Sequence, residues 1–158
     1  MASRNSPPPT SSPAEAPTDR RQDILNAALA CAAEGGVDTV TIDGVRARCG
    51  ASVGSIYHHF GNKDGIVAAL FFDIFHDQSR SVQAQLDAAR GVEAGVRALV
   101  TGYLDWVVAQ PERARFLFQA RSAVAAGPRT PDLAQAASRR FVLRAAGLVL
   151  QQILAGFE

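Results

Sequence analysis

Apolar residues recur along most of this chain at the three- and four-residue spacing of an amphipathic helix. The first such stretch runs from Asp19 to Glu34, with Thr18 or Asp19 as its N-cap and Gly35-Gly36 as its stop. Its apolar face is formed by Ile24, Leu25, Ala28, Leu29 and Ala32. The pattern therefore predicts a first helix over these residues.

Two short helices joined by a tight turn are predicted next. Thr41 is placed to cap a helix over 42–49, and Ser52 is placed to cap a second one over 53–60, with Gly50 in the turn between them. Two short helices with a glycine-containing turn, preceded by a third helix, form the layout of a helix-turn-helix DNA-binding domain. Spacing alone is weak evidence for DNA binding, because many helical bundles contain such corners.

The rest of the chain continues the helical pattern. We predict a helix from Lys63 toward Arg90, and further helices over Val92–Ala109, Pro111–Val124 and Asp132–Leu154. No stretch shows the sustained two-residue alternation of a strand. The predicted fold is all-α with six or seven helices, in which a helical bundle follows the three-helix N-terminal domain.

The composition and length are those of a chain with one packed domain and an irregular N-terminal segment. The 158 residues are 47% hydrophobic, and five of the eight prolines fall in residues 1–17 among serines and threonines. We therefore expect a disordered tail over 1–18, a DNA-binding domain over 19–66 and a helical effector-binding and dimerisation domain over 67–158.

Several functional classes are disfavoured by what the sequence lacks. No apolar leader or membrane-spanning stretch is present, and the two cysteines are too few for a disulfide framework, so a cytoplasmic protein is expected. Adjacent His58 and His59 point about 100° apart on a helix, which argues against a shared metal ion. Without a phosphate-binding loop or a catalytic constellation, we expect no enzyme activity and no cofactor.

The helix over 53–60 has a distinct inward and outward side. A helical wheel places Val53, Ile56, Tyr57 and Phe60 on the inward side. Gly54, Ser55, His58 and His59 then face outward. We expect the ring of Tyr57 to lie in the core, with its hydroxyl still able to reach a phosphate.

Three motifs stand out within residues 21–66: Thr-Ile at 41–42, Cys-Gly-Ala-Ser at 49–52 and the segment G-S-I-Y-H-H-F-G-N-K-D-G-I at 54–66. Through these motifs the stretch strongly resembles the TetR/AcrR family of bacterial transcriptional regulators. It implies a one-component regulator, most simply a repressor released from a pseudo-palindromic operator by a small molecule. A helical interaction module that does not bind specific DNA is the alternative.

The resemblance also assigns DNA-binding roles by position. It implies phosphate contact at Thr41 and contact with bases or backbone from the second short helix and its flanks, at Ser52, Val53, Gly54, Ser55, Tyr57, His58 and Lys63. His59 is a further candidate. Arg46 departs from the family pattern, which usually has a small residue there, so either the two short helices are splayed or the guanidinium is recruited to DNA.

Charge and side-chain type predict that few side chains read the DNA sequence through direct contacts with bases. Residues 19–66 hold five basic and six acidic side chains, a net charge of −1, so binding must depend on where the cations lie. The helix over 53–60 has no Arg, Lys, Asn or Gln, the residues that read purines bidentately. DNA shape should therefore contribute to recognition.

An effector site and a dimer interface are implied by the resemblance alone. Ordinary core is the simplest role for the aromatic residues, but the family pattern suggests a pocket for a small apolar or amphipathic effector lined by Phe71, Phe75, Tyr103, Trp106, Phe116 and Gln119. His76, Arg115 and Arg121 are further polar candidates. Against that pattern the chain is one or two helices short, so either it is truncated or its homodimer forms differently, around Phe141, Leu148 and Ile153.

Overall fold

The computed structural model describes residues 17–126, which form an all-α structure without a strand. The elements are α1 (Pro17–Gly35), the short 3₁₀ helix η1 (Val37–Thr39), α2 (Ile42–Cys49), α3 (Val53–Phe60), α4 (Lys63–Ala88), α5 (Val92–Ala109) and α6 (Pro111–Ala126). The predicted fold class is confirmed. No helix among the described residues has the length and apolar character needed to cross a membrane.

The helix boundaries follow the sequence pattern closely. α2, α3 and α5 begin and end at the predicted residues. α1 begins earlier, at Pro17 instead of Asp19, since proline suits the first turn of a helix. α4 ends two residues before Arg90, and α6 continues to Ala126. The helix predicted over Asp132–Leu154 and most of the tail lie outside the described residues.

Local capping explains why three consecutive helices begin where they do. The Thr41 hydroxyl accepts a hydrogen bond from the Gly44 amide at 3.0 Å, and the Ser52 hydroxyl accepts one from the Ser55 amide at 3.1 Å. Asn62 caps α4 in the same way. Gly50 ends α2 in the left-handed region, with φ at 64°, which a side chain would disfavour.

A single apolar core joins α1 and α4 to the elements around them. Its fully buried members come from every part of the N-terminal domain and from the following helices, and the largest are Phe116, Ile24, Leu25, Ile56, Ile66, Leu70 and Ile74. Trp106 of α5 is also buried in this cluster. Burial of these side chains from water is the main stabilising contribution to the arrangement.

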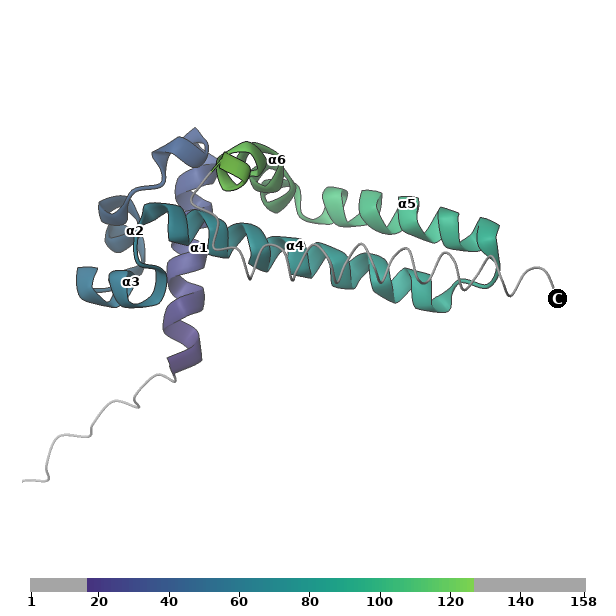
Figure 1. Ribbon diagram of the computed structural model, residues 1–158, viewed down its shortest axis with the longest axis horizontal. Helices are drawn as coiled ribbons and strands as arrows, with labels where there is room; N and C mark the ends of the chain where they lie inside the picture. The colour runs from purple at the N-terminus through teal and green to yellow at the C-terminus, as the bar shows by residue number, and fades with distance from the viewer. Residues whose placement is uncertain (1–16, 127–158) are drawn as a thin grey trace, which may run out of the picture.

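The long helix α4 connects the helix-turn-helix end to the rest of the molecule. Figure 1 shows α1, α2 and α3 gathered at one end, α4 leading away from them, α5 returning alongside α4, and α6 lying near α1. α4 contacts α1, α3, α5 and α6. A movement of α4 therefore necessarily changes its contacts with both ends of the molecule.

The corner between α3 and α4 requires a glycine. A Cβ atom at Gly65, in the first turn of α4, would lie 1.9 Å from the carbonyl oxygen of Phe60. Two helices approach this closely only when the side chain at the contact is absent. Gly65 thus sets how tightly α3 and α4 are joined.

Candidate nucleic-acid interface

α3 lies at the outer edge of the domain and exposes more of its surface than the wheel predicted. Ile56 is completely buried, and Phe60 is half-buried against the core. Val53, however, is 38% exposed and Tyr57 is 50% exposed. The prediction that the Tyr57 ring lies in the core is therefore wrong. The reason is that Tyr57 lies about 100° around the helix from Ile56, beyond the narrow strip of an eight-residue helix that is buried.

The outward residues leave space at the start of α3. Gly54, His58 and His59 are exposed, whereas Ser55 is half-buried. A Cβ atom added at Gly54 would have no heavy atom within 4 Å. The first turn of α3 therefore presents a small surface that a DNA backbone or base edge can approach, with the imidazoles farther along the helix.

The starts of α2 and α3 are suited to bind phosphate. The first amide groups of a helix have no acceptor within the helix, and they carry the positive end of its dipole. Thr41 and Ser52 are exposed at these two positions, and each hydroxyl oxygen accepts a capping hydrogen bond. Each hydroxyl proton can still be donated to an anion such as a phosphate oxygen.

The basic side chains of this domain differ in how many of their hydrogen-bond donors are already used within the protein. Arg48 donates to the carboxylate of Glu34 and, at 3.2 Å, to the Cys31 thiol, so it is occupied between α1 and α2. The hydrogen bond with Glu34 raises the pKa of Arg48 further. Lys63 is half-buried and donates to the carbonyl of Asp38 at 3.2 Å, which leaves two of its N–H groups for another acceptor.

Arg46 is exposed on α2. Its side chain forms no hydrogen bond or ion pair with another described residue. It therefore does not force α2 and α3 apart from within the core, and its guanidinium is available to an anion outside. This placement agrees with the second alternative from the sequence, in which the guanidinium contacts DNA.

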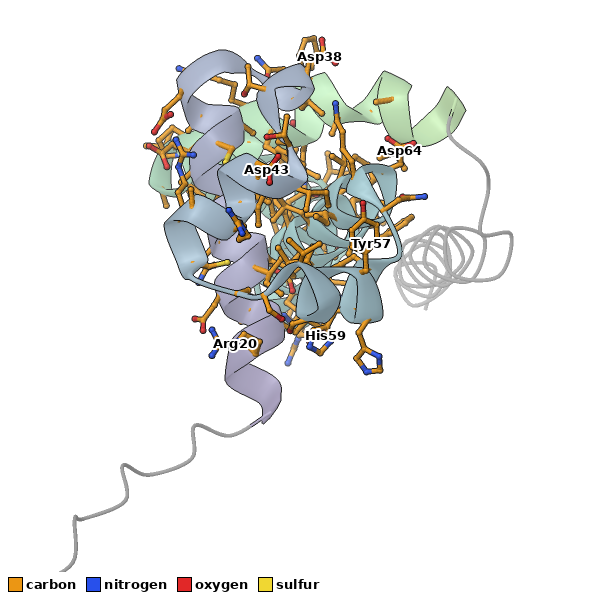
Figure 2. All side chains as sticks on the ribbon, turned by 90° about the vertical axis from the view of Figure 1, so that its left-hand side faces the viewer. Arg20, Asp38, Asp43, Tyr57, His59 and Asp64 are labelled. Carbon is orange, nitrogen blue, oxygen red and sulfur yellow. The ribbon has the colours of Figure 1, made fainter. Side chains whose placement is uncertain are left out.

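Acidic side chains share this end of the domain. Figure 2 looks onto it from the side of α2 and α3, and Asp43 and Asp64 are visible together with Tyr57 and His59. Asp43 and Asp64 lie in the first turns of α2 and α4, where a carboxylate stabilises a helix. They also weaken any attraction to phosphate, so Lys63 and Arg46 carry most of the favourable charge here.

The six residues predicted to line an effector pocket are not gathered around one described cavity. Trp106 and Phe116 are buried in the core, while Tyr103 is 49% exposed on α5 and Gln119 is exposed on α6. Phe71 and Phe75 are half-buried and stacked, with ring centroids 6.3 Å apart. The predicted interface residues Phe141, Leu148 and Ile153 lie outside the described part of the chain.

A cleft of about 560 Å³ lies elsewhere, between α1, the end of α3 and the first half of α4. Of the sequence candidates, His59 and His76 line it. Arg21 and Asp73 line it too. The sequence did not indicate either residue as part of an effector site, because nothing local marks two residues so far apart in the chain as neighbours. Arg115 and Arg121 are exposed on α6.

Known proteins resemble this chain in the same region. A family model described as bacterial regulatory proteins, tetR family, matches residues 24–70. The HTH-type transcriptional repressor AcnR of Corynebacterium jeikeium is 36% identical over 90 residues, a match that covers 56% of this chain and 45% of that repressor. The N-terminal part of the chain is therefore similar to TetR-family regulators.

Two further comparisons agree with this similarity. The HTH-type transcriptional regulator BetI 2 of Chromohalobacter salexigens is 33% identical over 88 residues, covering 54% of this chain and 42% of that regulator. A TetR family transcription regulator from Marinobacter aquaeolei VT8 has the same fold, with a TM-score of 0.68 at 16% identity over 88% of this chain and 69% of that one. The chain spans less than half the length of the two curated relatives.

Proposed function

We propose that this chain is a TetR-like one-component regulator that binds a pseudo-palindromic operator as a homodimer in the cytoplasm and represses transcription until a small effector releases it. The observation that carries the proposal is the exposed first turn of α3, whose N-cap Ser52 is an exposed hydroxyl residue, as is Thr41 at the start of α2. The related proteins named above are transcriptional regulators, so no enzymatic role is proposed.

The proposed contacts divide into those that position the protein and those that read the sequence. Thr41, Ser52, Tyr57 and Lys63 hold phosphates on the two sides of the major groove, with Arg46 and His59 as outer contacts. Gly54 permits close approach, and Val53, Ser55 and His58 meet base edges. Because few cations take part, a single subunit binds weakly and two subunits are needed for useful affinity.

The proposed release acts through α4. An apolar or amphipathic effector binds the helical domain. It favours the arrangement of α4 that does not fit DNA, and so changes the separation of the two α3 helices. A coupling of about 1–3 kcal/mol between effector and operator corresponds to a change of about 5- to 150-fold in operator affinity.

Selection from random DNA duplexes tests the proposed function directly. The full chain should enrich a pseudo-palindromic site and retard that duplex in a gel far better than a scrambled one. Failure to enrich any site would contradict the proposal and favour a helical interaction module instead.

A pair of variants at Ser52 then tests the site itself. Asparagine and aspartate both cap helices well, but only aspartate adds a negative charge where a phosphate is expected. Ser52→Asn should keep the thermal stability and most of the DNA affinity. Ser52→Asp should keep the stability and lose the affinity by at least about tenfold, since like charges repel. Equal affinities for the two variants would rule out phosphate contact at this helix start.

A further inference from the structure

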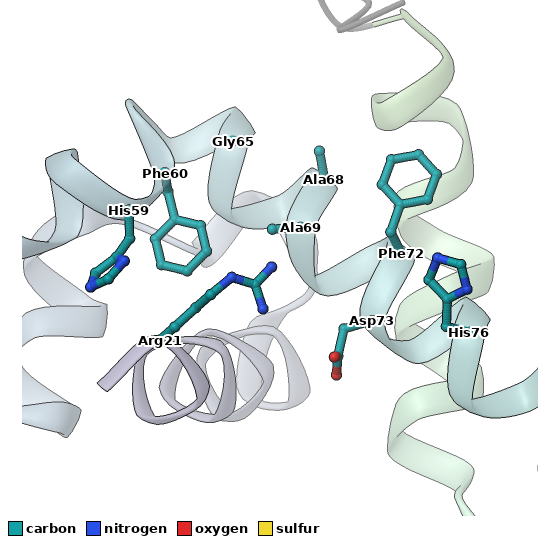
Figure 3. Close-up of a pocket in the computed structure, with 9 residues that line it drawn as sticks. All are labelled: Arg21, His59, Phe60, Gly65, Ala68, Ala69, Phe72, Asp73 and His76. Carbon is teal, nitrogen blue, oxygen red and sulfur yellow. The ribbon is translucent and has the colours of Figure 1, made fainter. Parts of the chain in front are cut away.

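The cleft between α1 and α4 combines apolar walls with charged side chains from two helices. Its apolar surface comes from Phe60 at the end of α3 and from Ala68, Ala69 and Phe72 on α4. Arg21 enters from α1, and Asp73 lies farther along α4. Figure 3 shows the Arg21 side chain running beneath the Phe60 ring toward Ala69, with Phe72 farther along the same opening.

The two charges of the cleft are not equivalent. Asp73 already faces a cation, because Nη2 of Arg113 on α6 lies 3.5 Å from its carboxylate. The guanidinium of Arg21 lies 5.6 Å from the centre of the Phe60 ring and pairs with no carboxylate in the described part of the chain. Among the described residues, no carboxylate therefore neutralises the charge of this cation in the cleft.

We propose that this cleft binds a small aromatic carboxylate. Arg21 forms a planar fork of donors that matches the two oxygens of a carboxylate, and such charge-assisted pairs are the strong and directional ones. The ring of the ligand lies over Ala68 and Ala69, against Phe60 and Phe72. The alanines leave the space that larger side chains would fill.

The size of the cleft agrees with a ligand of this class. Its volume of about 560 Å³ falls within the range of pockets that hold small organic molecules. Apolar walls with a few polar side chains are also the usual composition of such pockets, in which the polar groups decide orientation and specificity. Here the polar side chains are those of Arg21, His59, Asp73 and His76.

An occupant of this cleft touches the elements that position the DNA-binding surface. Phe60 is the last residue of α3, and Gly65, also at the cleft, forms the tight corner between α3 and α4. A bound ring would therefore bias the angle between α1, α3 and α4. This effect on DNA binding rests on the proposed function, whereas the binding of the carboxylate does not.

Titration calorimetry of the full chain tests the site without DNA. The probe is 2-naphthoate, and 2-naphthylmethanol is the neutral control of nearly the same shape. Wild type should bind one 2-naphthoate per chain and bind the alcohol at least about tenfold more weakly, because the alcohol lacks the charge that Arg21 recognises.

Three variants locate the binding. Arg21→Gln should reduce 2-naphthoate affinity at least about tenfold and leave binding of the alcohol unchanged. Ala68→Phe should fill the cleft and abolish binding of both probes. Arg97→Gln, which changes an exposed arginine on α5 that pairs with Glu93, should bind as wild type does. Circular dichroism confirms that each variant is folded.

The proposal is overturned by any of three results: no saturable binding of 2-naphthoate to wild type, the same affinity in Arg21→Gln as in wild type, or undiminished binding in a folded Ala68→Phe variant. Adding 2-naphthoate to the operator complex tests separately whether the ligand changes DNA binding. If calorimetry detects the ligand but no duplex is bound specifically, the cleft proposal stands and the proposed regulatory function fails.

Discussion

Arg113 on α6 donates a hydrogen bond of 2.8 Å to the carboxylate of Asp77 on α4. The same carboxylate oxygen accepts the indole N–H of Trp106 on α5 at 3.1 Å. One side chain of α4 therefore holds the two helices that follow it. Because α4 also contacts α1 and α3, Asp77 ties α5 and α6 to the element that positions the proposed DNA-binding surface.

Replacement of Asp77 by alanine should destabilise the fold by about 2 kcal/mol, since the buried Trp106 N–H loses its acceptor and Arg113 loses a charged partner. Urea unfolding measures the loss. Trp106 is the single tryptophan of the chain, so its fluorescence reports the same site. Arg80→Ala is the matched control, because Arg80 faces the other oxygen of Asp77 at 3.4 Å but its side chain is 80% exposed. Arg80→Ala should change the free energy of unfolding by less than about 0.5 kcal/mol. An equally small change in Asp77→Ala would show that the carboxylate does not hold these helices.

Two glycine-to-alanine changes should have opposite effects on stability. Gly65→Ala places a methyl group against the Phe60 carbonyl and should cost about 2 kcal/mol, because the α3–α4 corner must open. Gly54→Ala meets nothing within 4 Å and should stabilise α3 by about 0.5–1 kcal/mol. Thermal and urea unfolding check both values. Gly54→Ala should nevertheless bind the operator less well, since the added methyl blocks close approach, and destabilisation by Gly54→Ala would contradict the open surface described here.

Alanine at Tyr57 or Lys63 should weaken operator binding at least about tenfold and leave the helicity unchanged. Tyr57 is half exposed, so its loss removes little core packing, and Lys63 keeps free donors for a phosphate. Tyr103→Ala is a suitable control because Tyr103 is exposed to the same degree, 49%, but lies on α5. Gel retardation and circular dichroism are the measurements. If Tyr103→Ala impaired binding as much as Tyr57→Ala, the loss would not report a contact made by α3.

Stability should fall in alkaline solution through Cys31. Burial raises the pKa of this thiol above its ordinary value of 9.0, although Arg48 beside it acts in the opposite direction. The unfolded chain then loses the thiol proton first as the pH rises, so the contribution of Cys31 is complete below pH 9.0 and is lost above it. Urea unfolding between pH 7 and 10 should show a smaller alkaline decline in Cys31→Ala than in wild type. Cys49→Ala keeps Cys31 and should keep the full decline; identical slopes in wild type and Cys31→Ala would refute the assignment.

Local sequence was sufficient to predict the helices, because their boundaries depend on neighbouring residues. Thr41 and Ser52 cap the helices that they precede, and Gly50 ends α2, all through contacts within four residues. The motifs shared with the TetR family lie in the same stretch, which is why the resemblance could be seen before the fold was known. The same reasoning failed for Tyr57, because a wheel shows which residues share a face but not how wide a strip the neighbouring helices cover.

The sequence by itself thus determined the all-α class, the order and limits of the described helices, and the similarity of residues 24–70 to the TetR family. Only the tertiary structure decided which side chains remain available to bind an anion: Arg48 is held by Glu34, whereas Arg46 is exposed. It alone brought Arg21 of α1 to the cleft beside Phe60 and Asp73. The physical reason is range, since capping and periodicity act over a few residues, whereas burial and charge pairing depend on segments that meet only when the chain is folded.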